Sequence, residues 1–542
     1  MRKLENISRS EARLLPVLLV LLISVGCGEE ARFRLWAQLG SADSQFEYGM
    51  LLVPSEPREA IRWLEKAAAE GHLNAVLELV EVYRGERGLP GKPELATAWY
   101  QKASQRGHVQ SQLTLARRLA AGIGAPVNHG RAAKLFEAAA DAGNADAQYE
   151  LGKLYTSNTK GVFANSQKSR ERFLQAAEQG HADAMNHLGA LYLQGQDLAQ
   201  DLEQGRQWLL EAAKQDHGKS EWNLYILYSE GRGVERDLDE ARRWLLRAGD
   251  HGSLQAIQEL ALSYAEGRLF ERDLAQAARW YERAAERDDR DAAFRLCQLY
   301  DDEGEMPRPK AVLEWCRKAA EANLAEAQHA LALRYRTGNG VLQNNTMAAR
   351  WLRKAARSGH VAAHVELARM TLRGQGGKVN PGKAFEHFLE AAQAGDLESV
   401  MAVAGMYHQG RGVGKDPFRA FEWFLKAAER DNAQAMFIVA WGYETGDGVS
   451  LDVEKALRWY RTAATRNVSE AKLRLGILYA RGKGVERDYG EAHYWITGAV
   501  RNGLQAAKRH LDDLERRIEP GQLAGIRDTS DKRHQQEGKQ SS

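Results

Sequence analysis

Apolar residues recur with helical spacing in two consecutive segments of residues 469–503. In the first segment, Ala471, Leu475, Gly476 and Tyr479 lie three or four residues apart along the chain, which places them on one face of a helix. A glycine-rich turn follows, and the second segment has the same kind of spacing. The pattern predicts a helix–turn–helix hairpin. Neither apolar face can be buried within one hairpin, so we expect hairpins to stack on one another.

The hairpin repeats along most of the chain with a period near 36 residues. We number positions from a reference residue, the one that follows the second helix of each hairpin and is usually Gly, Asp or Asn. Position −8 then lies on that second helix, and positions +1 to +13 lie on the first helix of the next hairpin. The reference residues are Gly71, Gly107, Gly143, Gly180, Asp216, Gly252, Asp288, Asn323, Gly359, Gly395, Asp431, Asn467 and Gly503.

Aromatic residues keep the same register. Trp stands at position −8 in ten of the thirteen hairpins, and Tyr is usual at position +12. A fixed period of this length with helical spacing predicts an all-α fold, an α-solenoid superhelix of about thirteen helix–turn–helix repeats.

These segments resemble the Sel-one-like repeat, a relative of the tetratricopeptide repeat. The residues that carry the resemblance are Ala145-Asp146-Ala147 with Leu151-Gly152-Lys153-Leu154-Tyr155, the loop Gly446-Asp447-Gly448-Val449, and Ala277-Ala278-Arg279-Trp280-Tyr281. The resemblance covers roughly residues 41 to 515. It implies a solenoid that holds partner proteins, and it names no partner.

The N-terminus has the pattern of a bacterial lipoprotein signal. A basic region is followed by twelve apolar residues, too few for a comfortable membrane span, and then by Gly26 and Cys27. By resemblance to such signals, Cys27 would be lipidated and the mature protein would face the periplasm from the outer membrane. An ordinary cleaved signal with an incidental cysteine is the alternative.

The remaining boundaries follow from composition. We expect a lipoprotein-type signal peptide over residues 1–26 and a tether or partial N-terminal cap over 27–40. The repeat solenoid with a terminal capping helix takes residues 41–519, and residues 520–542 are expected to be a polar disordered tail.

The sequence offers no catalytic, metal or cofactor site. Five histidines share position +1, and a residue that recurs at one repeat position is a feature of the repeat (His72, His108, His181, His217 and His360). The glycine-rich turns lack the spacing of a phosphate-binding loop and follow helices. With 75 basic and 73 acidic residues the chain is close to neutral, which gives no argument for nucleic acid. We therefore expect a non-enzyme with no small-molecule substrate.

Two cysteines lie on the two helices of one hairpin. Cys297 follows a core leucine, and Cys316 follows the repeat tryptophan. A disulfide, which an oxidising periplasm permits, and two separate buried thiols are both compatible with the sequence.

Some large apolar residues lie off the predicted core face. At 100° per residue, positions +4, +8, +9 and +12 form the core stripe, whereas +3, +6, +10 and +13 point away from it. Related solenoids line a groove with these outer positions. We expect either a partner-binding groove or packing against the next hairpin at Tyr149, Trp222, Phe294, Met401 and Phe437 (position +6) and Trp441 (position +10).

Together these features predict a non-enzymatic protein–protein interaction scaffold anchored at the periplasmic face of the outer membrane. Its partners would be one or more envelope proteins. The architecture is similar to that of repeat lipoproteins of exopolysaccharide export, such as alginate export. The alternative is a secreted or surface-exposed protein that binds a host protein.

Overall fold

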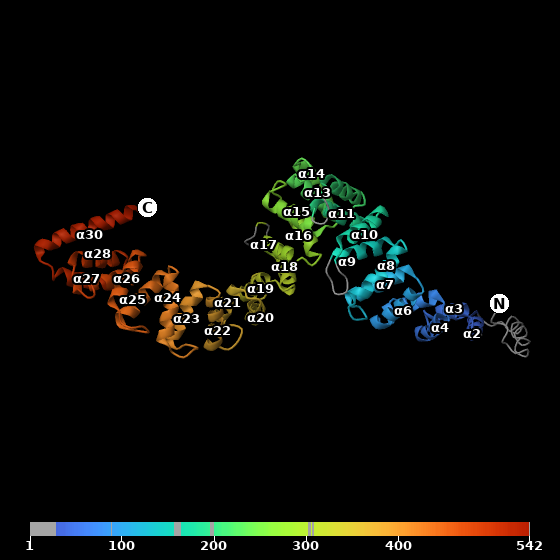
Figure 1. The fold of residues 1–542 in the computed structure, drawn as a ribbon. Coiled ribbons are helices and arrows are strands. Elements are labelled where there is room, and N and C mark those ends of the chain that lie inside the picture. Colours follow the sequence, from blue (N-terminus) through green and yellow to red (C-terminus); the bar gives the residue numbers. More distant parts are fainter. Residues whose placement is uncertain are drawn as a thin grey trace, which may run out of the picture. The chain divides into compact units, whose positions relative to one another are not determined.

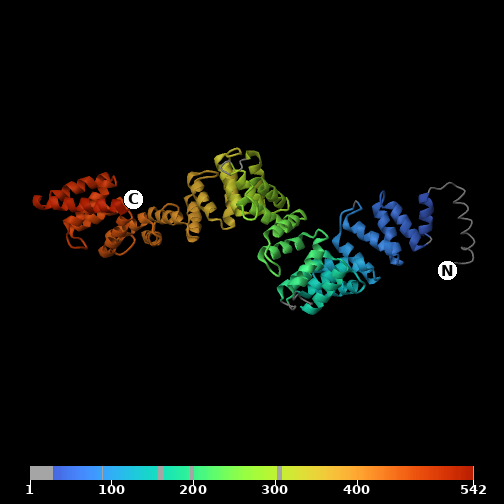
Figure 2. The ribbon, with the colours of Figure 1, turned by 90° about the horizontal axis from the view of Figure 1, so that it is seen from above.

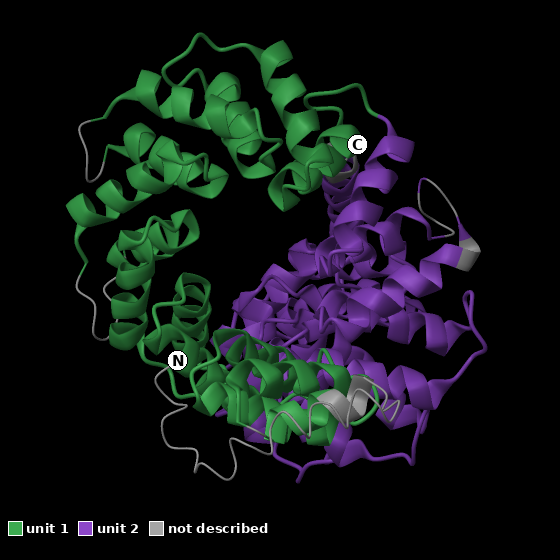
Figure 3. Ribbon diagram, turned by 90° about the vertical axis from the view of Figure 1, so that its right-hand side faces the viewer, with its two compact units in different colours: residues 1–272 green, residues 273–542 purple. Residues whose placement is uncertain are grey.

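The computed structural model describes residues 29–540, apart from 39, 88, 157–163, 196–199, 302–304 and 306–307. These described residues form 29 helices and no strand, as the repeat pattern predicts (Figure 1). They divide into two compact units, unit 1 up to Arg272 and unit 2 from Asp273 onward (Figure 3). Within each unit, helices consecutive in the sequence lie side by side (Figure 2).

The helices of unit 1 are α2 (Glu29–Gln38), α3 (Ala42–Leu52), α4 (Pro57–Ala69), α5 (Leu73–Arg84), α6 (Pro93–Gln105), α7 (Val109–Ala121), α8 (His129–Asp141), α9 (Ala145–Thr156), α10 (Ser166–Glu178), α11 (Ala182–Gln194), α12 (Leu202–Ala213), α13 (Gly218–Glu230), α14 (Leu238–Asp250) and α15 (Leu254–Glu266).

The helices of unit 2 are α16 (Leu274–Ala285), α17 (Arg290–Leu299), α18 (Pro309–Glu321), α19 (Ala325–Thr337), α20 (Asn345–Arg357), α21 (Val361–Arg373), α22 (Pro381–Gln393), α23 (Leu397–Gln409), α24 (Pro417–Glu429), α25 (Ala433–Thr445), α26 (Val453–Thr465), α27 (Ser469–Arg481), α28 (Tyr489–Arg501), α29 (Gln505–Glu515) and α30 (Pro520–Gln540).

The hairpin of α27 and α28 shows how the predicted core stripe is used. Ala471 and Leu475 are fully buried, and Tyr479 is 9% exposed. At Gly476 the two helices approach so closely that an added Cβ would lie 2.5 Å from a side-chain carbon of Ile496. The small residue at this position therefore sets the contact between the helices, and in this hairpin the four stripe positions lie in the core.

Each reference residue adopts a left-handed backbone conformation. Its φ is positive at the glycines and also at the non-glycine reference residues, where it lies between 55° and 67°. Those five residues are Asp216, Asp288, Asn323, Asp431 and Asn467. Glycine enters this region freely, and Asn and Asp enter it more readily than other residues. The recurrence of Gly, Asp and Asn at this position thus follows from how each second helix ends.

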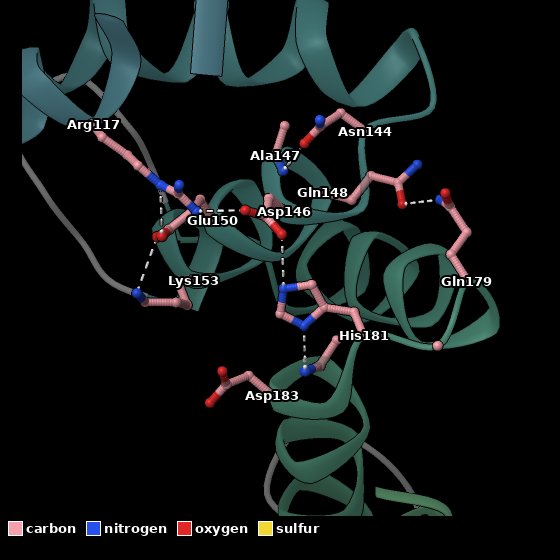
Figure 4. Close-up of polar contacts among 12 residues, drawn as sticks. Arg117, Asn144, Asp146, Ala147, Gln148, Glu150, Lys153, Gln179, His181 and Asp183 are labelled. Atoms are coloured by element: carbon pink, nitrogen blue, oxygen red, sulfur yellow. Dashed lines mark hydrogen bonds and ion pairs between the residues drawn. The ribbon is translucent and has the colours of Figure 1, made fainter. Parts of the chain in front are cut away.

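The recurring histidines cap the first helices. Nδ1 of each accepts a hydrogen bond from the backbone N–H three residues later, at 3.2 to 3.3 Å. In three of these caps Nε2 faces an aspartate of the preceding hairpin: His72 with Asp43 at 3.3 Å, His181 with Asp146 at 3.5 Å, and His217 with Asp183 at 3.4 Å. Figure 4 shows His181 between Asp146 and the start of α11. These contacts require the neutral imidazole with its hydrogen on Nε2.

The first and last described helices compare differently with the predicted N-terminal cap and the predicted disordered tail. Helix α2 packs on α3, and Ala37 joins the small core around Tyr48 and Trp63, so residues 29–38 form a capping helix. The expected disordered tail is wrong for residues 520–540, which form α30 and pack on α28.

Specific contacts hold α30 against α28. The His534 ring stacks on Tyr494 with centroids 4.5 Å apart, and the Arg533 guanidinium lies 3.6 Å from the same ring centroid. Leu523 and Ile526 pack against the core, and Ser530 is 2% exposed. The polar composition concealed these contacts because only a few residues of each helical turn touch the solenoid.

The histidine caps predict that the protein loses stability in mild acid. Burial lowers the pKa of His217 and of His360 below the ordinary value of 6.5. The unfolded chain therefore binds more protons than the folded one as pH falls below about 6.5, so the free energy of unfolding decreases there. In the double variant His217→Asn/His360→Asn, an amide oxygen keeps each cap without titrating, as Asn144 and Asn432 do in other hairpins.

Urea denaturation at pH 7.5 and pH 5.5 measures this effect. The decrease in the denaturation midpoint on acidification should be smaller in the double variant than in the unmodified protein. His408→Asn is the matched control because His408 is exposed and caps no helix. Equal decreases in the double variant and the unmodified protein would contradict the role given to the caps.

Candidate functional site

The outer positions of the first helices carry ion pairs over part of unit 1. Nη2 of Arg117 on α7 lies 3.1 Å from Asp146 on α9, and its Nε lies 3.3 Å from Glu150 (Figure 4). Lys153 pairs with Glu150 at 3.0 Å. Such half-exposed pairs contribute little to stability, so this surface is polar and well solvated.

The same arrangement recurs in unit 2 as far as α23. Glu366 on α21 pairs with Arg336 on α19 and with Arg369 at 3.2 Å, and Arg369 reaches Glu398 on α23 at 2.5 Å. Position +10 therefore holds a cation that joins one first helix to the next, at Arg117 as at Arg369.

From α23 to α27 the equivalent positions are apolar. Three consecutive first helices carry no polar side chain at either +6 or +10, and we call these six residues the C-terminal strip. The strip consists of Met401 and Gly405 on α23, Phe437 and Trp441 on α25, and Leu473 and Ile477 on α27.

Trp441 is the most accessible large side chain of the strip, at 36% exposure. On the preceding first helix, the same position is Gly405, where an added Cβ would meet no atom within 4 Å. A large exposed indole thus occupies the repeat position that is vacant on the neighbouring helix. Contiguous exposed apolar patches often mark interaction sites, and Trp441 contributes the most accessible side chain of the strip.

The rest of the strip lies at the edge of the core. Met401, Phe437 and Leu473 are half-buried and pack against the buried cluster of unit 2. The Phe437 ring lies 5.9 Å from that of Tyr460, whose hydroxyl donates a hydrogen bond of 2.7 Å to Glu444. Burial, followed by that hydrogen bond, raises the pKa of Tyr460. The base of the strip is therefore fixed, whereas Trp441 projects from it.

The other outer aromatic residues have different surroundings. Tyr149 stacks on His181 at 4.7 Å and lies 5.8 Å from Phe173, and burial raises its pKa to about 12. Trp222 lies 5.0 Å from Tyr225. Both rings, like that of Phe294, are half-buried. The structure places Met401, Phe437 and Trp441 on consecutive first helices, whereas Tyr149 and Trp222 belong to α9 and α13.

Sequence reasoning had missed Gly405, Leu473 and Ile477 as parts of one surface. The prediction rested on large apolar residues at single outer positions. The signal was present in the same register, since neither position +6 nor position +10 has a polar side chain in three hairpins in succession.

One buried acidic group belongs to an ion-pair network. Glu221 is fully buried and contacts His251 at 2.7 Å and Arg247 at 2.9 Å, and both partners also face Asp216. Ligand atoms of Asp216, Glu221 and His251 all lie within 4.8 Å of one another. Because the guanidinium already neutralises the carboxylates, we interpret the group as an ionic link between α13 and the end of α14.

The two internal cysteines are joined. Cys297 on α17 and Cys316 on α18 form a disulfide, with their Cα atoms 4.9 Å apart, and both are buried. Cys27, the predicted lipidation site, lies outside the described residues. Among the helices that the structure describes, none is both long and apolar enough to cross a membrane.

The comparisons with known proteins agree with this architecture. Thirteen segments match the model of the Sel1 repeat: residues 37–72, 82–108, 109–144, 145–181, 182–217, 226–253, 254–289, 290–324, 325–360, 361–396, 398–432, 433–468 and 469–504. No curated protein matches the chain.

Solved structures show the same repeat. The chain is similar to a protective antigen present in uropathogenic Escherichia coli strains, which displays an SLR fold. The two are 27% identical, with a TM-score of 0.54, over 80% of this chain and 93% of that one. A Sel1 repeat protein from Oxalobacter formigenes is 29% identical, with a TM-score of 0.44, over 57% of this chain and 90% of that one.

Proteins built from Sel1 repeats bind other proteins and typically act as non-catalytic interaction scaffolds. The matches to the repeat model run almost without interruption from residue 37 to residue 504, and this chain therefore belongs to the Sel1 repeat family.

Proposed function

We propose that this protein is a scaffold that a lipid on Cys27 holds at the periplasmic face of the outer membrane. Envelope proteins would bind at the C-terminal strip. The observation that carries the binding role is Trp441, an exposed indole on an apolar surface, beside a helix that has no side chain at the equivalent position.

The chemistry of the strip favours an apolar segment of a partner protein. Aromatic side chains that lose water on binding often contribute about 2 kcal/mol or more each. The ion-paired positions of α19 and α21 supply no comparable apolar area, since their charges are already satisfied by neighbours. Binding energy would thus be concentrated between α23 and α27.

Organisation of an export machine is the role we propose for this scaffold. Its thirteen repeats would hold several envelope proteins together, by analogy with the architecture of exopolysaccharide-export repeat lipoproteins. The support is the repeat number and the lipoprotein-type N-terminus.

A second candidate function has its own observation. The similar Escherichia coli protein is a protective antigen. This favours a secreted or surface-exposed chain whose strip binds a host protein. The cellular location of the protein distinguishes the two candidates. Only the first candidate requires that the protein stay at the periplasmic face of the outer membrane.

Replacing Cys27 tests the anchor. Cys27→Ser removes the thiol that would be acylated, so the protein should leave the outer-membrane fraction and lose its acyl label. Fractionation with metabolic acyl labelling measures both changes. Cys316→Ser serves as a control, because that cysteine is buried in a disulfide and should not affect fractionation. Unchanged labelling in the Cys27 variant would exclude the lipid anchor.

Replacing Trp441 tests the strip. Trp441→Ala should weaken partner binding by about 2 kcal/mol, or roughly thirtyfold, with little change in melting temperature. Tyr443→Ala on the same helix should have the opposite order of effects, because the Tyr443 ring packs edge-on against Phe421 at 5.0 Å. Capture of partners from outer-membrane extracts and thermal melting measure the two effects.

Gly405→Arg provides a further variant for the same test. It should block the strip while stabilising α23, since its side chain enters open space and glycine is unfavourable inside a helix. Capture that survives both Trp441→Ala and Gly405→Arg would show that partners bind elsewhere.

A further inference from the structure

A cavity of about 670 Å³ lies between α20 and α22, with α21 beneath it. These helices are the second helix of one hairpin and the complete next hairpin, so the cavity is built from α20–α22 alone, whereas the C-terminal strip lies on α23, α25 and α27. Its volume falls within the range of small-molecule sites.

The cavity exists where the repeat tryptophan is missing. Position −8 of this hairpin is His387, whereas the preceding hairpin has Trp351 there, buried to 7% exposure. Imidazole is much smaller than indole, so the space between consecutive second helices is not filled. His387 lines the cavity.

A second small residue enlarges the same cavity. The loops of three later hairpins place Val413, Val449 and Val485 against the core, but this hairpin has Gly377 at the equivalent position. An added Cβ at Gly377 would meet no atom within 4 Å. Gly377 also lines the cavity, so two large-to-small replacements in one hairpin open a single space.

The floor carries a histidine pair with defined hydrogens. Nε2–H of His364 donates to the carbonyl oxygen of Ala356 at 3.0 Å. Nδ1 of His364 is therefore an acceptor and receives the Nδ1–H of His387 at 3.3 Å. This leaves Nε2 of His387 as a free acceptor at the cavity. Burial, and next the neighbouring His364, lower the pKa of His387.

The walls carry an excess of positive charge. Arg353, Arg357, Lys378 and Lys383 line the cavity with a single carboxylate, Glu386, which makes four positive charges against one negative, or +3. Within the described part of the chain, none of these four cations lies in an ion pair, unlike Arg336 and Arg369 on α19 and α21. Like charges that repel one another around a cavity favour a bound anion.

We propose that this cavity binds a compact polyanion, a small molecule with two or more carboxylate or phosphate groups. The four cations bind its charged oxygens, and Nε2 of His387 accepts a hydrogen bond from a hydroxyl or protonated oxygen of the same ligand. This site is separate from the scaffold role and does not depend on it. It makes the molecule a ligand-binding protein without assigning any reaction.

Calorimetric titration of the full chain with citrate and with pyrophosphate, at about 50 mM salt to limit screening, tests the site. We expect one mole of at least one probe to bind per mole of chain. Binding of citrate alone assigns a carboxylate ligand, binding of pyrophosphate alone assigns a phosphate ligand, and binding of both assigns recognition by charge. If neither probe binds, the proposal is overturned.

Variants that fill the cavity and keep all four cations distinguish binding in the cavity from binding to a basic surface. The pair His364→Gln/His387→Trp copies Gln328 and Trp351 of the preceding hairpin, where Gln328 donates to the equivalent carbonyl oxygen at 3.0 Å. Gly377→Val restores the usual loop residue. Each filled variant should bind the probe at least about tenfold more weakly with no lower melting temperature. If both filled variants bind the probe as tightly as the unmodified chain does, the proposal is overturned.

Variants that remove charge but keep the cavity complete the test. Arg353→Gln/Lys383→Gln removes two charged donors and should weaken binding by about tenfold or more. Arg373→Gln is the matched control, because Arg373 is exposed near the cavity without lining it. Equal binding by the double variant and this control would show that the cavity cations do not hold the ligand.

Discussion

The left-handed residue at the end of each second helix is the constraint on which the rest of the structure depends. It reverses the chain within one residue, so that the next first helix starts at once and stacks on the hairpin before it. Only Gly, Asn and Asp occupy it, in agreement with the steric cost that other side chains have in this region. Every hairpin ends in the same way, and the period stays near 36 residues.

This regular ending determines which positions are free to vary. Positions +4, +8 and +9 face the second helix of the same hairpin and must be small or apolar, as the close contact between Gly476 and Ile496 shows. Positions +6 and +10 lie at the edge of the core or on the surface, and there the chain carries the ion pairs of Arg117 and Arg369 in some hairpins and the apolar surface around Trp441 in others. The chemical character of this surface can therefore change from hairpin to hairpin while the backbone fold of the hairpins stays the same.

The fold could be predicted from the sequence because its determinants recur thirteen times in one register. Features that occur only once could not be predicted in this way. Helix α30 depends on stacking between Tyr494 and His534, residues 40 positions apart whose proximity no local pattern shows. The pairing of His364 with His387 likewise joins two helices. The sequence signal of this pair was the absence of tryptophan from position −8 of one hairpin. The repeat pattern, which is defined by the residues that recur, does not show such an absence.

Departures from the repeat are therefore more informative about function than the repeat itself. Trp441 adds a large residue at a position that is a glycine on the preceding first helix and an arginine on the one before it, and it gives an apolar surface. His387 and Gly377 remove large residues, and they give a basic cavity. Both changes occur at positions that the backbone tolerates, since neither involves a reference residue or a core stripe position. In a solenoid each hairpin packs mainly on its neighbours, so such changes act locally. The same array can thus carry two unlike surfaces, one for an apolar segment of a protein and one for an anion.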